Sequence, residues 1–363
     1  MNNNLSIKKN VYLRVTCITL LILLLQSPCV FSENSLSIGT TYSSRQSEYL
    51  EMDPRETYLS VLDMGFSIIR VGAYWSDIEK EKDVYDFTEL DWQIDEAARK
   101  NIPIVLTVGM KAPRWPEYFI PDWIKDNISL SGNSDASKQE YLRERTLKFI
   151  EKTVKRYNDR KIIHYWQVEN EALNRFGGEY WYIGRDFLEK EVDLVRKIDA
   201  GKRKIILTAA TYPNGLLRFL ADLSVRHDPI KENLKLCDIL GLNVYPIVGH
   251  DLWGLKLYFR SKGTSRRKYF SKLIERVKEA GKDAWIVEFQ AEPWEPGHLV
   301  YKDKKRPVTS KPLMLEKDIK EFYELGFKVI FLWGAEYWCF RDARHDDRVW
   351  VDAVEDIIKV SKE

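Results

Sequence analysis

The chain has 363 residues, a formal net charge of +2 at pH 7 and an ordinary globular composition, which allows one large domain or two smaller ones. So small a net charge gives no broad attraction for nucleic acid, and the short basic runs at 266–268 and 302–306 indicate solvated loops. Nucleic acid is therefore not expected as a partner. Aromatic residues make up 13% of the chain and include twelve Trp, more than a core alone usually requires.

The first 32 residues have the pattern of a signal peptide. Basic residues at positions 8, 9 and 14 precede an apolar run from Val15 to Leu25, and small or branched residues precede a cut after Ser32. The run is shorter than the roughly 20 apolar residues of a spanning helix. We therefore expect export with cleavage of residues 1–32, and contact with the membrane only through this segment. A retained membrane anchor is the alternative, and Pro28 disfavours lipidation of Cys29.

Two cysteines, Cys237 and Cys339, lie beyond this leader. A disulfide between them is compatible with export. Neither stands in a Cys-x-x-Cys spacing, and a cysteine without such a partner is more often a small buried hydrophobe. We expect two separate buried thiols.

From Leu36 onward, strand-like runs alternate with amphipathic helical ones. The expected strands are 36–41, 68–71, 104–108, 162–168, 205–209, 239–244, 285–289 and 329–333. The expected helices run near 54–65, 88–98, 138–157, 184–199, 216–225, 269–280, 315–325 and 351–360. Because no composition break separates these units, we predict a single parallel α/β domain over residues 33–363.

The connections indicate which α/β fold is present. Helix-to-strand turns are tight and carry a residue suited to a left-handed helix cap, at Gly65, Asn101, Gly201, Gly281 and Gly326. Strand-to-helix connections are long at 110–137, 245–265, 290–312 and 334–348, and loops of that length are usually functional. Elaboration at the carboxyl ends of the strands is typical of a (β/α)8 TIM barrel. An open doubly wound sheet is the alternative, but no Gly-x-Gly-x-x-Gly follows the first strand.

Two of the expected strands end in carboxylates. The run 162–168 leads into Glu169-Asn170-Glu171, and the run 285–287 leads into Glu288. A carboxylate at the end of a buried strand is costly unless something uses it, although a lone one would be interpreted as a solvated loop residue. The fourth and seventh strands of a barrel lie across its mouth from each other, so a paired-carboxylate site is predicted. Retaining hydrolysis of glycosides uses two carboxyls about 5 to 5.5 Å apart.

Several motifs resemble the clan A glycoside hydrolases, retaining (β/α)8 barrels with Asn-Glu after the fourth strand and Glu after the seventh. The matching residues are Arg70, Asn170, Glu171, Tyr245, Glu288 and Trp333. The run from Tyr74 to Asp91 is similar to the second strand-helix unit of families 5, 39 and 42. The family 42 β-galactosidases are the most similar in sequence to the run Trp166-Gln167-Val168-Glu169-Asn170-Glu171.

The resemblance implies a role for each of these residues. Glu171 would be the general acid and base and Glu288 the nucleophile. Asn170 would bind the sugar 2-hydroxyl, and Trp333 would form an apolar floor for the sugar ring. Burial would raise the pKa of Glu171, whereas Arg70 would hold Glu288 ionised and Tyr245 would orient it. The implied substrate is a carbohydrate with a β-glycosidic bond, and no cofactor or metal is expected.

Other residues compete for these roles. Glu169 is close to Glu171 but occupies a position that the clan leaves variable, and Glu292 is interpreted as a loop residue. Arg70 has a structural ion pair as its alternative role, and His164 is interpreted as a core residue. Five tryptophans are candidates for lining sugar subsites, although each is as consistent with packing: Trp75, Trp115, Trp123, Trp181 and Trp294.

Two other classes of protein stay open at this point. A carbohydrate-binding barrel without turnover would keep the tryptophans but need neither Glu171 nor Glu288, so the presence of both disfavours it. A metal enzyme is disfavoured because the five His are scattered and form no His-Glu-x-x-His, and no Gly-x-Ser-x-Gly supports an esterase. Galactoside, glucan, mannan and other β-linked sugars are equally compatible with the sequence.

Overall fold

A computed structural model describes residues 35–175, 177, 179–212, 215, 228–261 and 263–362. The chain divides into residues 1–35 and 36–363, and the fold below is that of the second unit. The expected signal peptide and the expected helix at 216–225 lie outside the described residues. Within the described ranges, no helix combines the length and apolar character needed to cross a membrane.

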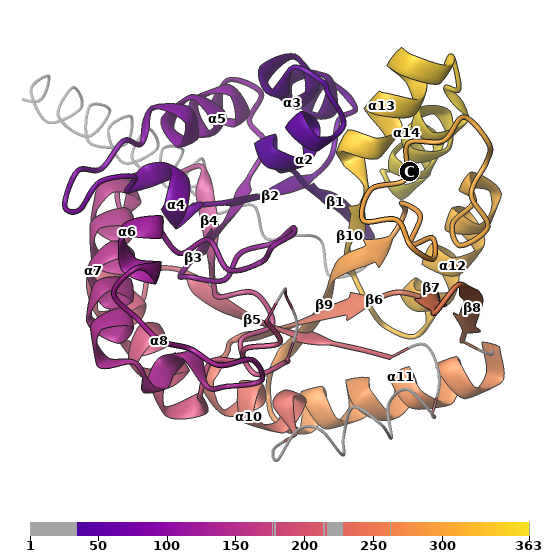
Figure 1. The fold of residues 1–363 in the computed structure, drawn as a ribbon. Helices are drawn as coiled ribbons and strands as arrows, with labels where there is room; N and C mark the ends of the chain where they lie inside the picture. The colour runs from indigo at the N-terminus through magenta and orange to yellow at the C-terminus, as the bar shows by residue number, and fades with distance from the viewer. Residues whose placement is uncertain are drawn as a thin grey trace, which may run out of the picture. The chain divides into compact units, whose positions relative to one another are not determined.

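Eight parallel strands close into a barrel (Figure 1). The strands are β1 (Ser37–Thr41), β2 (Ile68–Gly72), β3 (Ile104–Val108), β4 (Ile163–Val168), β5 (Lys204–Ala210), β6 (Ile239–Val244), β9 (Asp283–Gln290) and β10 (Val329–Trp333). Each strand pairs with the next in this sequence, and β10 pairs with β1 to close the ring. The predicted (β/α)8 TIM barrel is confirmed, and the expected strands agree with the observed ones within about two residues.

Helices surround the barrel on its outside (Figure 1). They are α2 (Ser44–Tyr49), α3 (Pro54–Asp63), α4 (Trp75–Ile78), α5 (Thr88–Arg99), α6 (Asp122–Lys125), η1 (Ala136–Lys138), α7 (Glu140–Tyr157), α8 (Arg185–Asp199), α10 (Pro229–Leu236), α11 (Gly263–Glu279), α12 (Pro312–Glu324), α13 (Ala335–His345) and α14 (Val349–Ser361). At the start of α3, the Asp53 side chain accepts a hydrogen bond from the Glu56 backbone N–H, ahead of a proline at the first helical position.

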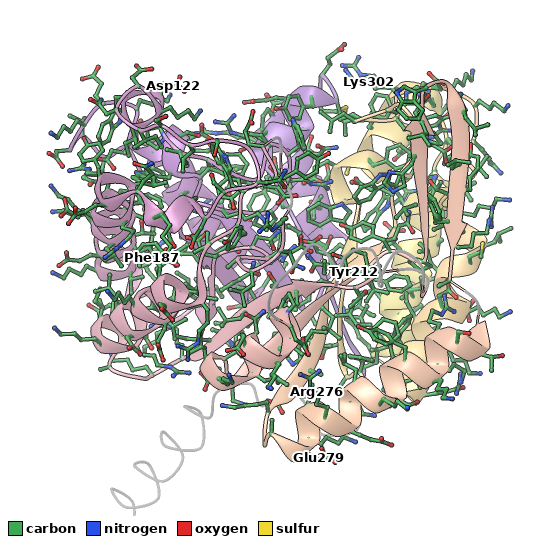
Figure 2. The ribbon with its side chains drawn as sticks, turned by 60° about the horizontal axis from the view of Figure 1, so that its bottom comes forward. Asp122, Phe187, Tyr212, Arg276, Glu279 and Lys302 are labelled. Atoms are coloured by element: carbon green, nitrogen blue, oxygen red, sulfur yellow. The ribbon has the colours of Figure 1, made fainter. Side chains whose placement is uncertain are left out.

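The barrel has two distinct ends. Figure 2 shows Lys302, in the loop after β9, at one end and Arg276 and Glu279, near the end of α11, at the other. Below the carboxyl ends of the strands lies a cluster of aromatic rings, in which the Trp285 ring centroid lies 4.7 Å from that of Tyr165, edge to face, and 6.2 Å from that of Phe331. This packing fills the barrel, so polar side chains gather at the carboxyl ends of the strands.

The structure contains elements that the sequence analysis did not predict, among them the short helices α2, α4, α6 and η1. The connection after β6 contains a hairpin of β7 (Ile247–Leu252) and β8 (Leu255–Arg260), and the connection after β10 contains α13. Helix α10, capped by the Asp228 side chain, was not predicted. These are short elements, and in such windows hydrophobic periodicity is a weak signal.

Cys237 and Cys339 are buried and unbonded to each other, as expected. Burial raises the pKa of each thiol to about 12. Both side chains therefore belong to the packed interior as small apolar groups.

Candidate active site

Glu169 and Glu171 leave the end of β4 in an uncommon backbone conformation. Their φ angles are 59° and 49°, in the left-handed region that non-glycine residues rarely occupy. The Glu169 carboxylate accepts hydrogen bonds from the backbone N–H groups of Met110 and Lys111, at 2.8 and 2.6 Å. Any side chain at Gly109 would collide with that carboxylate, since a Cβ there would lie 2.2 Å from its Oε1. Glu169 therefore ties the end of β4 to the end of β3, and Glu171 is held in a strained conformation of the kind found at functional sites.

Glu288, on β9, is held from two sides. Its carboxylate accepts hydrogen bonds from Arg70 Nη2 at 2.8 Å and from the Tyr245 hydroxyl at 2.7 Å, and the residue is only 4% exposed. Burial and the neighbouring carboxylate of Glu288 raise the pKa of Tyr245 well above its ordinary value, so the phenol stays a donor. The contacts predicted for Arg70 and Tyr245 are both present.

Arg70 connects Glu288 to the rest of the barrel. Its side chain is fully buried, with Nε donating to Thr41 Oγ1 at 2.9 Å and Nη1 donating to Gln167 Oε1 at 3.1 Å. The guanidinium on β2 therefore reaches residues of β1, β4 and β9 at once. A buried cation with three partners can hold one carboxylate in a single orientation.

Glu171 has a different environment. It is 7% exposed, and its Oε1 accepts a hydrogen bond from Asn243 Nδ2 at 2.6 Å. Burial, followed by the negative charges of Glu117 and Glu288, raises the pKa of Glu171 to about 8, against the opposing effects of Lys111 and Asn243. This is the environment of a carboxyl that keeps its proton at neutral pH.

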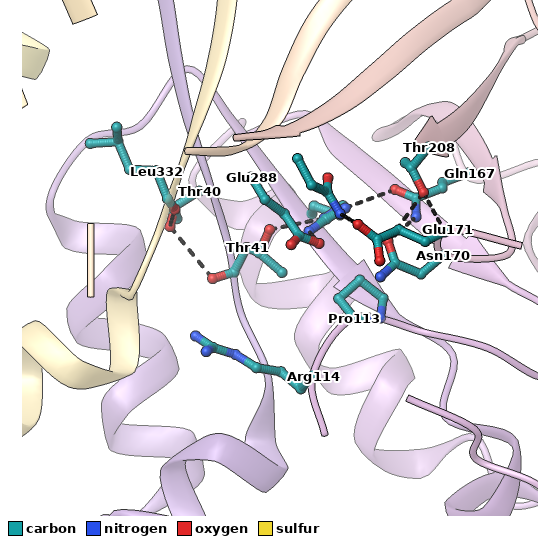
Figure 3. Close-up of polar contacts among 12 residues, drawn as sticks. Thr40, Thr41, Pro113, Arg114, Gln167, Asn170, Glu171, Thr208, Glu288 and Leu332 are labelled. Carbon is teal, nitrogen blue, oxygen red and sulfur yellow. Dashed lines mark hydrogen bonds and ion pairs between the residues drawn. The ribbon is translucent and has the colours of Figure 1, made fainter. Parts of the chain in front are cut away.

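The two carboxyl groups extend toward one another in Figure 3, from opposite sides of the view. Asn243 connects them, because its side chain contacts Glu171 while its backbone is paired in register with Glu288 on the neighbouring strand. The charge of Glu288 also raises the pKa of Glu171, which requires the two groups to lie within electrostatic range. Sequence-distant carboxyls at the ends of β4 and β9 thus meet at one site.

Asn170 is oriented by its neighbours. Its Oδ1 accepts hydrogen bonds from Gln167 Nε2 at 3.1 Å and from Thr208 Oγ1 at 3.3 Å (Figure 3). Within the described ranges its amide nitrogen makes no hydrogen bond, which leaves it available to donate to a bound hydroxyl.

Trp333, at the end of β10, has one ring face covered. The Arg114 guanidinium lies 3.9 Å from the ring centroid and pairs with both Glu292 and Glu336. The interpretation of Glu292 as a loop residue agrees with its position after β9, and its side chain binds Arg114. The Arg70 guanidinium also lies 5.8 Å from the same ring centroid, and Trp333 is only 7% exposed, so the ring lies between the two arginines and the barrel wall rather than on an open surface.

The five candidate subsite tryptophans divide into packed and exposed residues. Trp75 is fully buried, stacks on Phe149 at 5.3 Å and donates to Glu79, so the proposed subsite role is wrong for it. Trp123 and Trp181 donate to backbone carbonyls of Glu79 and Ser131. Trp115 and Trp294 are 42% and 43% exposed, and Trp294 packs edge-on against Tyr245 at 5.1 Å.

His164 lies near the start of β4, away from the carboxyl end of the strand. Its side chain is half-buried, and burial lowers its pKa. This position supports the packing interpretation.

Comparison with known proteins gives one partial sequence match and many structural ones. Residues 50–185 match the family model Glyco_hydro_42, described as beta-galactosidase, and no curated protein matches the chain. Xylanase 10B from Thermotoga petrophila RKU-1 has a TM-score of 0.56 at 16% identity, over 91% of this chain and 96% of the xylanase. Gan42B, a GH42 beta-galactosidase from G. stearothermophilus, has a TM-score of 0.63 at 16% identity, over 91% of this chain and 57% of Gan42B.

The chain resembles the clan A glycoside hydrolases. The resemblance predicted from the sequence is confirmed: the partial family match is to a model described as beta-galactosidase, and the solved xylanases and β-galactosidases share the barrel fold. The chain spans a little more than half the length of the β-galactosidases, 56% of the one from Bacillus circulans sp. alkalophilus at a TM-score of 0.61 and 13% identity.

Sequence reasoning missed several polar residues of this site. They are Lys111, Arg114, Glu117, Gln167, Asn243 and Glu336. A signal was present for two of them: Asn243 is a polar residue within an apolar strand run, and Glu336 follows Trp333 closely. Lys111, Arg114 and Glu117 lie in the long connection after β3, which was expected to be functional but offered no periodic pattern.

Beneath the site, Glu169 faces a second buried carboxyl. Glu191, on α8, is fully buried, and neither of its carboxyl oxygens has a hydrogen-bond partner within the described ranges. Burial raises the pKa of Glu169 to about 7, and burial together with Glu169 raises that of Glu191 well above its ordinary value. Because Glu169 accepts two backbone N–H groups, Glu191 is the better candidate to hold the proton and donate it.

We predict that Glu191→Gln flattens the dependence of stability on pH. Carboxyl pKa values raised by folding stabilise the protein below about pH 4.5, and that contribution is lost as the pH rises through about 7. Glutamine can donate to Glu169 but has no proton that titrates. The free energy of unfolding of the variant minus that of wild type should therefore be about 1 to 3 kcal/mol higher at pH 8 than at pH 4.5. Urea unfolding at several pH values measures this. Asp193→Asn, exposed on the same helix, is the control, and an equal loss at every pH would contradict the shared proton.

Proposed function

We propose that the chain is an exported retaining glycoside hydrolase, which cleaves β-glycosidic bonds of an oligo- or polysaccharide by double displacement. The observation that carries the proposal is the convergence of Glu171 and Glu288 on one site in unlike environments. One carboxyl is buried against other acids and favours its protonated form, and the other is fixed by a cation and a phenol. That division is what an acid and a nucleophile require.

In the first displacement, Glu288 attacks the anomeric carbon while Glu171 protonates the leaving oxygen. Arg70 and Tyr245 donate to the two oxygens of Glu288 and so fix its direction of attack. The Asn170 amide is oriented to donate to the sugar 2-hydroxyl, a bond that strengthens in an oxocarbenium-like transition state. Trp333 supplies apolar ring surface at the edge of the site.

In the second displacement, Glu171 acts as a base. The charge of Glu288 is one cause of the high pKa of Glu171. That charge disappears when Glu288 is esterified by the sugar, so the pKa of Glu171 falls and the carboxylate can take a proton from water. The electrostatics of the pair therefore change in the direction that the reaction needs.

The matched family and the solved neighbours supply candidate sugars. The partial family match favours a β-galactoside, and a β-xyloside is the next candidate from the xylanase neighbours. Export rests on the leader at residues 1–32 alone, and a retained membrane anchor is its alternative. The remaining alternative of another class is a barrel that binds carbohydrate without turnover.

The first test is a screen of residues 33–363 against aryl β-galactoside, β-xyloside, β-glucoside and β-mannoside, with product anomers followed by NMR. We expect hydrolysis of at least one, with the β-anomer formed first because two inversions restore the configuration. First formation of the α-anomer would exclude the double displacement. Binding without hydrolysis of any of the aryl glycosides or of plant and bacterial polysaccharides would favour the non-catalytic alternative.

We predict unlike effects for the two glutamate variants. Glu288→Ala should abolish hydrolysis of every substrate in a protein that still shows the folded circular dichroism spectrum, although its stability should fall because Arg70 loses its buried partner. Glu171→Ala should cost about 10²- to 10⁴-fold on natural glycosides and less on activated aryl glycosides, whose leaving groups need little protonation. Glu275→Ala, on the exposed side of α11, is the control. Equal losses on both substrate types would contradict the assigned role of Glu171.

The pH dependence of kcat/KM gives a further prediction. Because Glu171 must hold its proton in the free enzyme, activity should fall as the pH rises through about 8. Initial rates at low substrate concentration across pH 5 to 10 measure this limb. In Glu171→Ala the limb should be absent, and its persistence there would assign it to another group.

A further inference from the structure

The connection after β3 folds back on itself beside the site. A bridge pairs Lys111 with Tyr118, and the Glu117 backbone N–H donates to the Arg114 carbonyl at 2.8 Å to close a turn between them. The Lys111 side chain lies inward and is fully buried, whereas the side chain of Glu117 is 21% exposed. A fully buried lysine is costly unless its ammonium has partners.

The partners of Lys111 come from two loops. Its Nζ lies 3.0 Å from Glu117 Oε2, in an ion pair within its own loop. The same Nζ donates to the backbone carbonyl of Glu171 at 3.2 Å and to that of Asn174 at 3.5 Å, both in the loop after β4. The ammonium therefore joins a carboxylate to the backbone of the acid/base residue.

Both peptide groups of Glu171 are fixed by side chains. Its N–H donates to Thr208 Oγ1 at 2.6 Å, and its carbonyl accepts from Lys111. The next residue back is fixed as well, because the Asn170 N–H donates to the Lys111 carbonyl at 2.8 Å. Since the φ of Glu171 is positive, these contacts hold a backbone conformation that glutamate would otherwise avoid.

We propose that Lys111 and Glu117 form a positioning pair for Glu171, in which Lys111 holds its backbone and Glu117 neutralises the ammonium so that it does not stabilise the Glu171 anion. This inference rests on the proposed acid/base role of Glu171. Neither residue of the pair is assigned contact with the substrate, and each acts through Glu171. With Glu117 beside it, the Lys111 ammonium can hold the backbone of Glu171 without favouring loss of the Glu171 proton.

The charges facing Glu171 agree with this arrangement. Lys111 and Glu117 approach from the loop after β3, Glu288 from β9 and the neutral Tyr245 from the end of β6. After burial, Glu117 and Glu288 raise the pKa of Glu171, whereas Lys111 lowers it. The two charges of the pair therefore act on Glu171 in opposite directions, and removal of Glu117 would take away one of the two negative charges that oppose the effect of Lys111.

The test is Glu117→Gln, which keeps the size of the side chain and removes its charge. The alkaline limb of kcat/KM should shift to lower pH by about one unit, as expected for loss of a nearby like charge. Glu117→Ala should shift the limb in the same direction. Asp347→Asn weakens the buried pair with Arg341 elsewhere in the fold and should leave the limb unchanged.

A second measurement follows Glu171 directly. A 13C NMR titration of glutamate carboxyls, with the Glu171 signal assigned by its loss in Glu171→Gln, should show the same downward shift in Glu117→Gln. A folded Glu117→Gln protein in which neither the limb nor the titration moves, or in which either moves upward, would overturn the positioning pair. If wild type hydrolyses no glycoside, the proposed function fails, while the titration still decides whether the pair controls Glu171.

Discussion

The structure depends on a buried cation at the mouth of the barrel. Arg70 is fully buried and binds Thr41, Gln167 and Glu288, which belong to β1, β4 and β9. A charge removed from water must be compensated by partners of good geometry, and loss of one partner leaves the other uncompensated. Arg70 therefore requires polar partners on the neighbouring strands, and these partners make the mouth of the barrel polar. Aromatic packing around Trp285 fills the interior farther from the mouth.

Two glutamates of the same chemical type acquire different properties from this setting. Glu288 lies between a guanidinium and a phenol, whereas Glu171 lies among acids with an amide as its side-chain partner. The difference arises from the side chains that reach each carboxyl: β6 supplies Asn243 to Glu171, whereas β2 supplies Arg70 and the chain just after β6 supplies Tyr245 to Glu288. An asymmetric site thus forms on a nearly symmetric barrel.

The loop after β3 extends the polar network beyond the matching motifs. Its backbone N–H groups bind Glu169, its lysine binds the carbonyl of Glu171, and its arginine covers one face of Trp333. These contacts connect the ends of β4, β9 and β10 through a single loop. Beneath them, Glu169 and Glu191 form a buried acid pair that restricts the pH range of maximal stability. The site is therefore supported by ionisable groups whose protonation states depend on one another.

The amino-acid sequence by itself determined the barrel and the position of Glu171 and Glu288 at the carboxyl ends of two of its strands. These features depend on local patterns: alternating apolar runs, turn residues such as Gly65 and carboxylates at the ends of strands 162–168 and 285–289. It did not determine the partners of Lys111, Arg114 or Glu336, nor the burial of Trp75 in the core. Those outcomes depend on contacts between residues tens to hundreds of positions apart, and only closure of the barrel brings such residues together. Ion pairs and side-chain burial carry no periodic signal along the chain, so tertiary structure alone decided them.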